Sequence, residues 1–292
     1  MRKFYKVLKN LKLFCQLLFG HAMGRIGVVL IAMVLIAALF APVLWTVDPQ
    51  NVGKREDILL APSGEHWLGT DDLGRDVWSQ IVFGSRVSLT IGLITAFVTF
   101  VTGTLVGLIA GYFGGWIEEA LIKIVDFFMM LPVLPLMIIL AAVLGPSFWN
   151  IILVLSVVSW PTTARVVRSQ VLSVKERPYV EAARCIGAGN MKLMFGEILP
   201  NVLPLMFAQA VLMITYAIYG EAVLAFLGLG DPTRISWGSM LHFAFVSGVM
   251  ARSPWWIGPP IVGIIILIVG FSLLGTAVTD VMTPQYRETK GL

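Results

Sequence analysis

The sequence offers few side chains suited to catalysis. Its histidines are His21, His66 and His242, and its cysteines are Cys15 and Cys185. No metal-ligand spacing and no nucleophile with a matched base appears among them, so neither a catalytic dyad nor a metal site is predicted. The sequence also lacks the G-x-x-x-x-G-K-[ST] phosphate loop. We therefore expect this chain to have no enzyme activity and to bind no cofactor itself.

The stretch YVEAARCIGAGNMKLMFGEILP, at positions 179–200, is charged and interrupted by glycines, although it lies between two long apolar runs. Pro178 suits the first position of a helix that continues through Glu181. Gly187 is expected to end this helix, and Asn190 to cap a second short one.

On that second helix, apolar residues recur at i, i+3, i+4 and i+7, namely Met191, Met194, Phe195 and Ile198. This spacing predicts one apolar ridge along the helix. Such a ridge suits a groove on a soluble partner, and methionine adapts well to grooves. The alternative is that the ridge packs against the chain's own helices, and periodicity does not decide between the two.

The composition sets the environment of this stretch. Hydrophobic residues make up 58% of the 292 positions and charged residues 13%, with a mean hydropathy of +0.87. Soluble domains have about 25% charged residues, so an integral membrane protein is predicted. A span needs about 20 apolar residues, and the sequence is expected to contain six. The apolar runs are 27–47, 87–117, 127–164, 198–230 and 253–279. The run 127–164 is long enough for two spans, which would form a hairpin about Gly145–Asn150. The run 198–230 is interrupted by one acid.

The distribution of lysine and arginine predicts the orientation. With the N-terminus inside, the inner segments carry 15 of the 21 basic residues and the outer segments carry 6. This bias places both termini in the cytoplasm of a multi-pass protein of the cell inner membrane. The net charge of +4 then reflects topology, and no nucleic-acid partner is expected. Residues 1–25 read as a basic amphipathic segment on the lipid surface, with a frayed tail as the alternative.

A glycine repeat and a polar loop are two further features of the sequence. Gly103, Gly107 and Gly111 recur every four residues, which predicts that another helix approaches closely. Residues 48–86 are expected to form an extracytoplasmic loop ending in an interfacial helix. Within it, His66 lies near Asp71 and Asp72, and a solvated turn with a helix cap is favoured over a metal site.

Several motifs resemble one transporter family. Glu181-Ala182-Ala183, Gly187 and Ile198-Leu199-Pro200 resemble the EAA loop of ATP-binding-cassette (ABC) importer permeases, although Glu197 stands where that pattern has an aliphatic residue. HWLGTDDLGRDVWSQIVFGSRVSL, GYFGGWIEE, AFLGLGDP with SWGSML, and DVMTPQYR resemble the C-type permease subunit of dipeptide, oligopeptide and nickel importers.

The resemblance implies an all-α, type I ABC importer permease fold. Its expected parts are residues 1–25, a first membrane helix at 26–47, the loop 48–86, a five-helix permease core at 87–283 and a cytoplasmic tail at 284–292. The core would include the EAA coupling loop at 165–200 and an outer loop at 229–254. Glu181, Ala182, Ala183 and Arg184 would shape the coupling loop, Gly187 its turn, Met191, Met194 and Phe195 its ridge, and Pro200 the start of the fifth span.

The implied partners are a second homologous permease, two ABC ATPase subunits that use ATP and Mg, and an extracytoplasmic solute-binding protein. The implied substrate is a di- or oligopeptide, with nickel, glutathione or oligosaccharide as alternatives. An ion-coupled carrier is disfavoured, because such carriers usually need several ionisable groups within the membrane. Glu221 is the one acid well inside an apolar run. It would either line the path and meet a peptide's ammonium group or be held structurally by hydrogen bonds.

Overall fold

The computed structural model describes residues 17–44, 48–249 and 251–282. The predicted tail at 284–292 and most of the basic segment at 1–25 lie outside these ranges. The helices are α2 (Ala22–Leu44), η1 (Arg55–Asp57), α3 (Val77–Phe113), α4 (Gly115–Met130), α5 (Val133–Leu144), α6 (Phe148–Lys175), α7 (Pro178–Cys185), α8 (Asn190–Lys192), the π-helical turn η2 (Leu193–Ile198), α9 (Leu199–Phe226), α10 (Trp237–Val246) and α11 (Pro254–Met282).

Five helices of the described chain are long and apolar enough to cross a membrane, and α4 with α5 forms a sixth candidate that is bent by 92°. The bend falls at Leu131, which has an extended conformation because it precedes Pro132. The predicted turn after this span is present at Gly145, whose φ is 82°. The prediction of six spans therefore agrees with the structure only when this broken pair counts as one.

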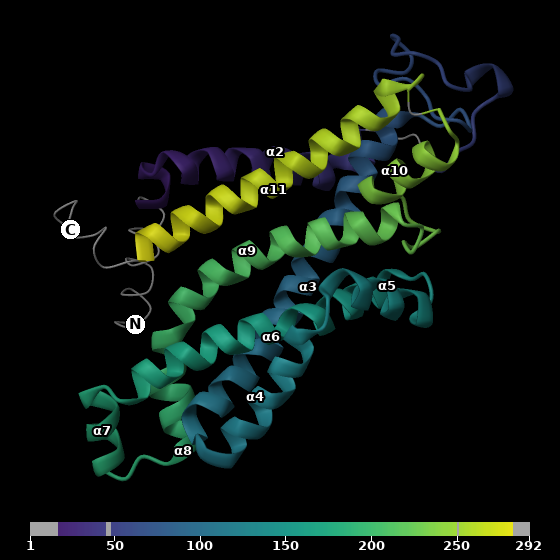
Figure 1. Ribbon diagram of the computed structural model, residues 1–292. Coiled ribbons are helices and arrows are strands. Elements are labelled where there is room, and N and C mark those ends of the chain that lie inside the picture. The colour runs from purple at the N-terminus through teal and green to yellow at the C-terminus, as the bar shows by residue number, and fades with distance from the viewer. Residues whose placement is uncertain (1–16, 45–47, 250, 283–292) are drawn as a thin grey trace.

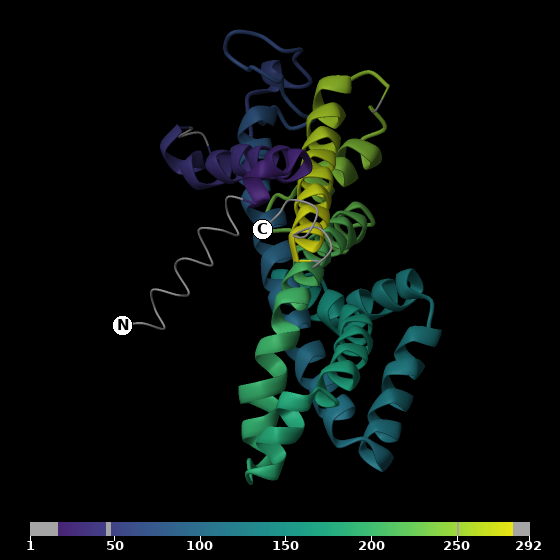
Figure 2. The same ribbon diagram turned by 90° about the vertical axis from the view of Figure 1, so that its left-hand side faces the viewer.

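The helices form an elongated bundle whose two ends differ. Figure 1 shows α7 and α8 at one end, and the loop before α3 together with α10 at the opposite end. We call these the α7 end and the α10 end. Helix α2 packs along α11, while α4 and α5 lie on the α6 side of the bundle (Figures 1 and 2).

The contact between α3 and α6 is the most extensive helix pairing in the described chain. Gly103, Gly107 and Gly111 all face α6 across this contact. A Cβ atom added at Gly107 would lie 2.7 Å from the Val167 Cβ, and one at Gly111 would lie 2.9 Å from the Val171 Cβ. Both distances are shorter than real Cβ contacts allow, so the two helices can lie this close only because the side chains are absent.

Two predicted elements need correction. The stretch before the second span is no separate interfacial helix, because α3 runs unbroken from Val77 to Phe113. Its first turns are buried by packing against α10 and the outer loop, and Asp76 caps it by accepting a hydrogen bond from the Ser79 N–H. The outer loop at 229–254 contains the helix α10, which hydropathy did not reveal because it is only ten residues long.

Replacing Gly107 by alanine should weaken the α3–α6 contact, because the new methyl group meets α6 atoms with no room to move. Overpacking of this kind costs about 1 to 3 kcal/mol, which corresponds to a fall of about 2 to 10 °C in the midpoint of thermal unfolding. Gly258→Ala in α11 is the matched control, since its Cβ would meet nothing within 4 Å. Equal midpoints for both variants, measured on purified protein in detergent, would contradict this role of Gly107.

Candidate functional site

The α7 end carries the EAA stretch on a short, exposed helix. Helix α7 is anchored by Val180, which is fully buried, while Glu181, Ala182 and Arg184 are exposed. The helix ends at Cys185, and the glycine expected to stop it, Gly187, lies two residues beyond with a φ of 87°. There the Ala188 N–H donates to the Ala183 carbonyl at 3.0 Å, so the left-handed glycine satisfies the last carbonyls of the helix.

The second predicted helix of this segment differs from expectation. Residues 190–226 form one continuous helical stretch, in which α8 passes through the π-helical turn η2 into α9. The four residues of the predicted ridge do not share one exposed face. Met194 and Ile198 are buried among the α6 valines, whereas Met191 and Phe195 are exposed by 69% and 41%. Half of the ridge therefore anchors the segment to its own bundle.

Polar contacts join the helices that meet at this end. The Tyr112 hydroxyl, at the end of α3, donates to Asn190 Oδ1 at 2.8 Å. Lys175, at the end of α6, donates through Nζ to the Gly111 carbonyl at 2.9 Å. Arg168 Nε donates to Glu118 Oε1 at 2.6 Å. Of these three bonds, the first joins α8 to α3, the second joins α6 to α3, and the third joins α6 to α4.

The exposed apolar residues at this end form a surface that we call the coupling surface. Its members are Tyr179, Ile186, Met191 and Phe195, with Ile186 exposed by 85%. Arg184 and Lys192 are also exposed here. Of these four residues, only Met191 and Phe195 are predicted from the sequence, because Tyr179 and Ile186 fit no helical period. Exposed apolar residues with a basic rim are typical of a protein-docking surface.

A cavity of about 520 Å³ opens between α5, α6 and α9. Its polar lining comes from uncharged groups, among them Ser159, Thr162, Gln209, Tyr216 and Tyr219. Tyr216 and Tyr219 are more than half exposed. The sequence does not predict these residues as a site, since uncharged polar side chains do not stand out within apolar runs.

Glu221 follows this lining on α9 but faces another way. Its side chain is 1% exposed, and its carboxylate accepts a hydrogen bond from the Ser88 hydroxyl at 3.1 Å. The Ser236 hydroxyl, at the start of α10, also hydrogen-bonds to it. Glu221 therefore joins α9 to α3 and α10, and its position matches the structural alternative.

The α10 end is closed by a buried polar network in the loop before α3. Asp71 is fully buried, so the predicted solvated turn is wrong at this residue. Its Oδ2 accepts from Arg75 Nε at 2.6 Å and from Gln80 Nε2 at 2.7 Å, and its Oδ1 accepts two backbone N–H groups. These four donors stabilise the charge of the Asp71 carboxylate, which is out of contact with water.

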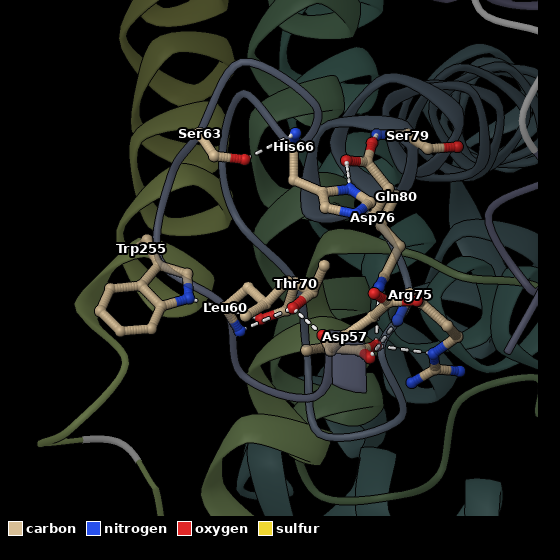
Figure 3. A network of polar contacts seen from close by, with 11 residues as sticks. Asp57, Leu60, Ser63, His66, Thr70, Arg75, Asp76, Ser79, Gln80 and Trp255 are labelled. Carbon is tan, nitrogen blue, oxygen red and sulfur yellow. Dashed lines mark hydrogen bonds and ion pairs between the residues drawn. The ribbon is translucent and has the colours of Figure 1, made fainter. Parts of the chain in front are cut away.

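The same network holds the loop in position on α3 and α11. Figure 3 shows His66 beside Asp76, with His66 Nδ1 3.0 Å from Asp76 Oδ1. Thr70 accepts a hydrogen bond from the Leu60 N–H at 2.8 Å, and its carbonyl lies 3.4 Å from Nε1 of Trp255 on α11 (Figure 3). His66 thus supports the helix cap of α3, and a group of three metal-binding side chains is absent from the described residues.

Two carboxyl groups at this end have shifted pKa values. Burial, reinforced by the neighbouring Asp71 carboxylate, raises the pKa of Asp72. Burial alone would raise the pKa of Asp231 as well. Hydrogen bonds from Thr233 and from the Phe148 N–H, together with the charge of Arg234, instead hold the Asp231 pKa below its ordinary value. The ionised Asp231 carboxylate therefore links the loop after α9 to Phe148, the first residue of α6, by accepting its N–H.

Comparisons with known proteins agree with this architecture. Residues 103–288 match the family described as binding-protein-dependent transport system inner membrane component. The chain is 35% identical over 268 residues to a dipeptide transport system permease protein of Alkalihalophilus pseudofirmus, covering 91% of this chain and 87% of that one. It is 33% identical over 273 residues to an oligopeptide transport system permease protein of Bacillus subtilis, covering 92% and 88%.

The fold is also found among solved structures. An inward-facing structure of the MetNI methionine ABC transporter matches with a TM-score of 0.55 and 22% identity. The match covers 70% of this chain and 97% of the other. At this identity the likeness shows a shared fold, that of a type I ABC importer permease.

Removing the Glu221 carboxylate should destabilise the helix packing. Glu221→Ala leaves the Ser88 and Ser236 hydroxyls buried without their partner, which costs about 1 to 3 kcal/mol. Glu221→Gln keeps an oxygen that accepts the Ser88 hydrogen bond and should unfold close to the parent temperature. Thermal unfolding in detergent measures both. An alanine variant as stable as the parent would contradict the structural role.

The Asp231 carboxylate should stabilise the protein in a pH-dependent way. Because the folded-state pKa is lowered, the stabilisation is present above the unfolded value of about 3.9 and is lost as the pH falls through the folded value. The difference in unfolding midpoint between the parent and Asp231→Asn should thus be largest near pH 7 and shrink below about pH 4. A difference that stays constant across this range would rule out the charge-dependent role.

Proposed function

Because this chain belongs to the family of inner membrane components of binding-protein-dependent transport systems, the permease subunits of ABC importers, we propose that it carries di- and oligopeptides across the membrane under the control of separate ATPase subunits. The observation that carries this proposal is the position of the coupling surface. Two of its members, Met191 and Phe195, lie on the helical stretch that continues directly into α9, and α9 lines the cavity. A partner that moves the coupling surface would therefore move a wall of the cavity.

The coupling surface is suited to a groove on an ATPase subunit. Met191 and Phe195 would supply flexible and aromatic contacts, while Arg184 and Lys192 would add charge at the rim. The exposed EAA face of α7 would complete the contact. ATP binding would shift the ATPase groove, and the permease would follow because its two states make different contacts with that groove.

The peptide path would run along the cavity between α5, α6 and α9, at the junction with a second permease subunit. Gln209, Tyr216 and Tyr219 offer hydrogen bonds without charge. Such groups suit peptide backbones, which every substrate shares, and leave side-chain choice to the binding protein. The names of the two similar permeases, for dipeptides and oligopeptides, support this substrate class over nickel, glutathione or oligosaccharide.

The proposed orientation places the α7 end in the cytoplasm, where ATP and Mg would be used by the two ATPase subunits. The α10 end, with its loop at 48–76, would face outward and receive the solute-binding protein. Both termini would be cytoplasmic, and the chain itself would bind no cofactor. This arrangement follows the excess of basic residues on the inner side.

Reconstitution of the whole transporter tests the proposed function. We expect proteoliposomes that contain both permeases, the ATPase subunits and the binding protein to take up a labelled dipeptide only with ATP and Mg. Nickel, glutathione and an oligosaccharide should not compete. Peptide uptake that persists without the ATPase subunits would instead support an ion-coupled carrier, and competition by one of the other solutes would change the substrate class.

Truncating the coupling surface should uncouple transport while leaving the fold intact. Because buried interface anchors often contribute more than 1 kcal/mol each, Met191→Ala with Phe195→Ala should lower ATP-driven uptake about tenfold or more. Met23→Ala, an exposed methionine on α2, is the matched control. The assay compares uptake and co-purification of the ATPase subunits. Unchanged uptake in the double variant would contradict the coupling role.

A further inference from the structure

A second hollow lies between α3 and α6, on residues that do not line the cavity. It is a groove of about 580 Å³ whose lining is almost entirely apolar. Ile94, Val98 and Val106 form its α3 side, and Trp149, Leu153 and Trp160 form its α6 side. Trp149 is 63% exposed and Leu153 is 51% exposed. The groove is therefore open to the surroundings of the bundle.

The groove is long enough to take an acyl chain of one leaflet. Ile94 and Val106 are separated by three turns and a fraction of α3, which is about 18 Å at a rise of 1.5 Å per residue. One leaflet contributes about half of the 30 Å hydrocarbon core, or about 15 Å. Trp149 stands at the α10 end of the groove, and exposed tryptophans are enriched at the membrane–water interface.

Basic groups lie directly beyond that end of the groove. A neighbouring hollow of about 730 Å³ begins at Thr90 on α3 and Phe148 on α6 and extends between α3, the end of α2 and the loops at 48–50 and 233–235. It is lined by Arg86 and Arg234. Arg86 is the last charged residue before the uncharged run of α3, so it lies where the apolar zone begins.

The two arginines are available for an anion. The Arg234 guanidinium lies over the Phe148 ring, 4.4 Å from its centroid, which fixes its position without using its N–H groups. Arg86 is exposed and makes no ion pair with another described side chain. One acid, Asp48, also lines the hollow, and its carboxylate accepts the Gln50 N–H at 2.9 Å. The residues that line the hollow carry two positive charges and one negative charge. Arg234 also interacts with the charge of Asp231, which lies outside the lining.

We propose that this composite site binds an anionic phospholipid, with the phosphate at Arg86 and Arg234 and an acyl chain in the groove between α3 and α6. Guanidinium groups bind phosphate oxygens through paired N–H donors. The apolar groove would hold the acyl chain of the same lipid. The site is independent of the proposed transport function. It requires only that the chain lies in a membrane.

A lipid fits these observations better than the other occupants. An apolar face of a second permease would fill the groove but would offer no anionic group to the two guanidinium groups beyond its end. A free phosphate would neutralise the arginines but would leave the apolar groove uncovered. Only an amphiphile with an anionic head matches both halves.

Native mass spectrometry of the full-length chain in detergent tests the proposal. The probes are phosphatidylglycerol and phosphatidylcholine with identical acyl chains. We expect at least about tenfold greater occupancy for phosphatidylglycerol, because each basic residue near an anionic headgroup adds to the preference. Arg86→Gln with Arg234→Gln should remove this preference, and Arg86→Gln alone should reduce it. Arg252→Gln, an exposed arginine at the same end but outside the hollow, should leave it unchanged.

Three further results would overturn the proposal. The first is equal retention of phosphatidylglycerol by the parent and by the double variant, once unchanged thermal unfolding shows that both are folded. The second is undiminished lipid binding by Val98→Trp, which fills the groove and should displace an acyl chain. The third is complete displacement of phosphatidylglycerol by glycerol 3-phosphate, which would identify a site for soluble anions instead.

Discussion

The close contact between α3 and α6 is the constraint on which the rest of the structure depends. Three glycines let the two helices approach so closely that any larger residue would separate them. At the α7 end, Lys175 reaches the Gly111 carbonyl only because α6 lies against α3 at this distance. Toward the α10 end, the same two helices leave the apolar groove open. The α3–α6 contact thus determines both the helix arrangement at the α7 end and the shape of the groove.

The two ends of the bundle are stabilised by different physical means. The α10 end has a buried carboxylate, Asp71, with four hydrogen-bond donors, and a second buried acid, Glu221, that joins three helices. Buried polar groups of this kind allow little rearrangement, because breaking one contact leaves a buried polar atom without a partner. The α7 end instead presents apolar side chains to the surroundings, held from behind by Met194 and Ile198. This asymmetry suits a bundle that is rigid at one end and moved by a partner at the other.

Sequence patterns revealed the membrane class, the span regions, the turn at Gly187 and the glycine repeat that lies against α6. They did so because hydropathy, left-handed turns and small-residue spacing are local properties. The break at Leu131, the continuity of α8 with α9 and the burial of Met194 depend on tertiary packing, which periodicity does not encode. The buried state of Asp71 was missed for the same reason, since its donors, Arg75 and Gln80, become partners only when α3 begins earlier than hydropathy suggests. The cavity lining escaped notice because Gln209, Tyr216 and Tyr219 carry no charge.

The central claim is that movement of the coupling surface is transmitted to the cavity between α5, α6 and α9. The most direct test uses the assembled transporter with Cys15 and Cys185 replaced by alanine and a single cysteine introduced as Tyr216→Cys. The rate at which a thiol reagent labels this cysteine is measured with and without ATP. The account predicts that ATP changes the labelling rate, and that truncating Phe195 to alanine in the same protein abolishes the change. An ATP response that is equally large after this truncation would contradict the account.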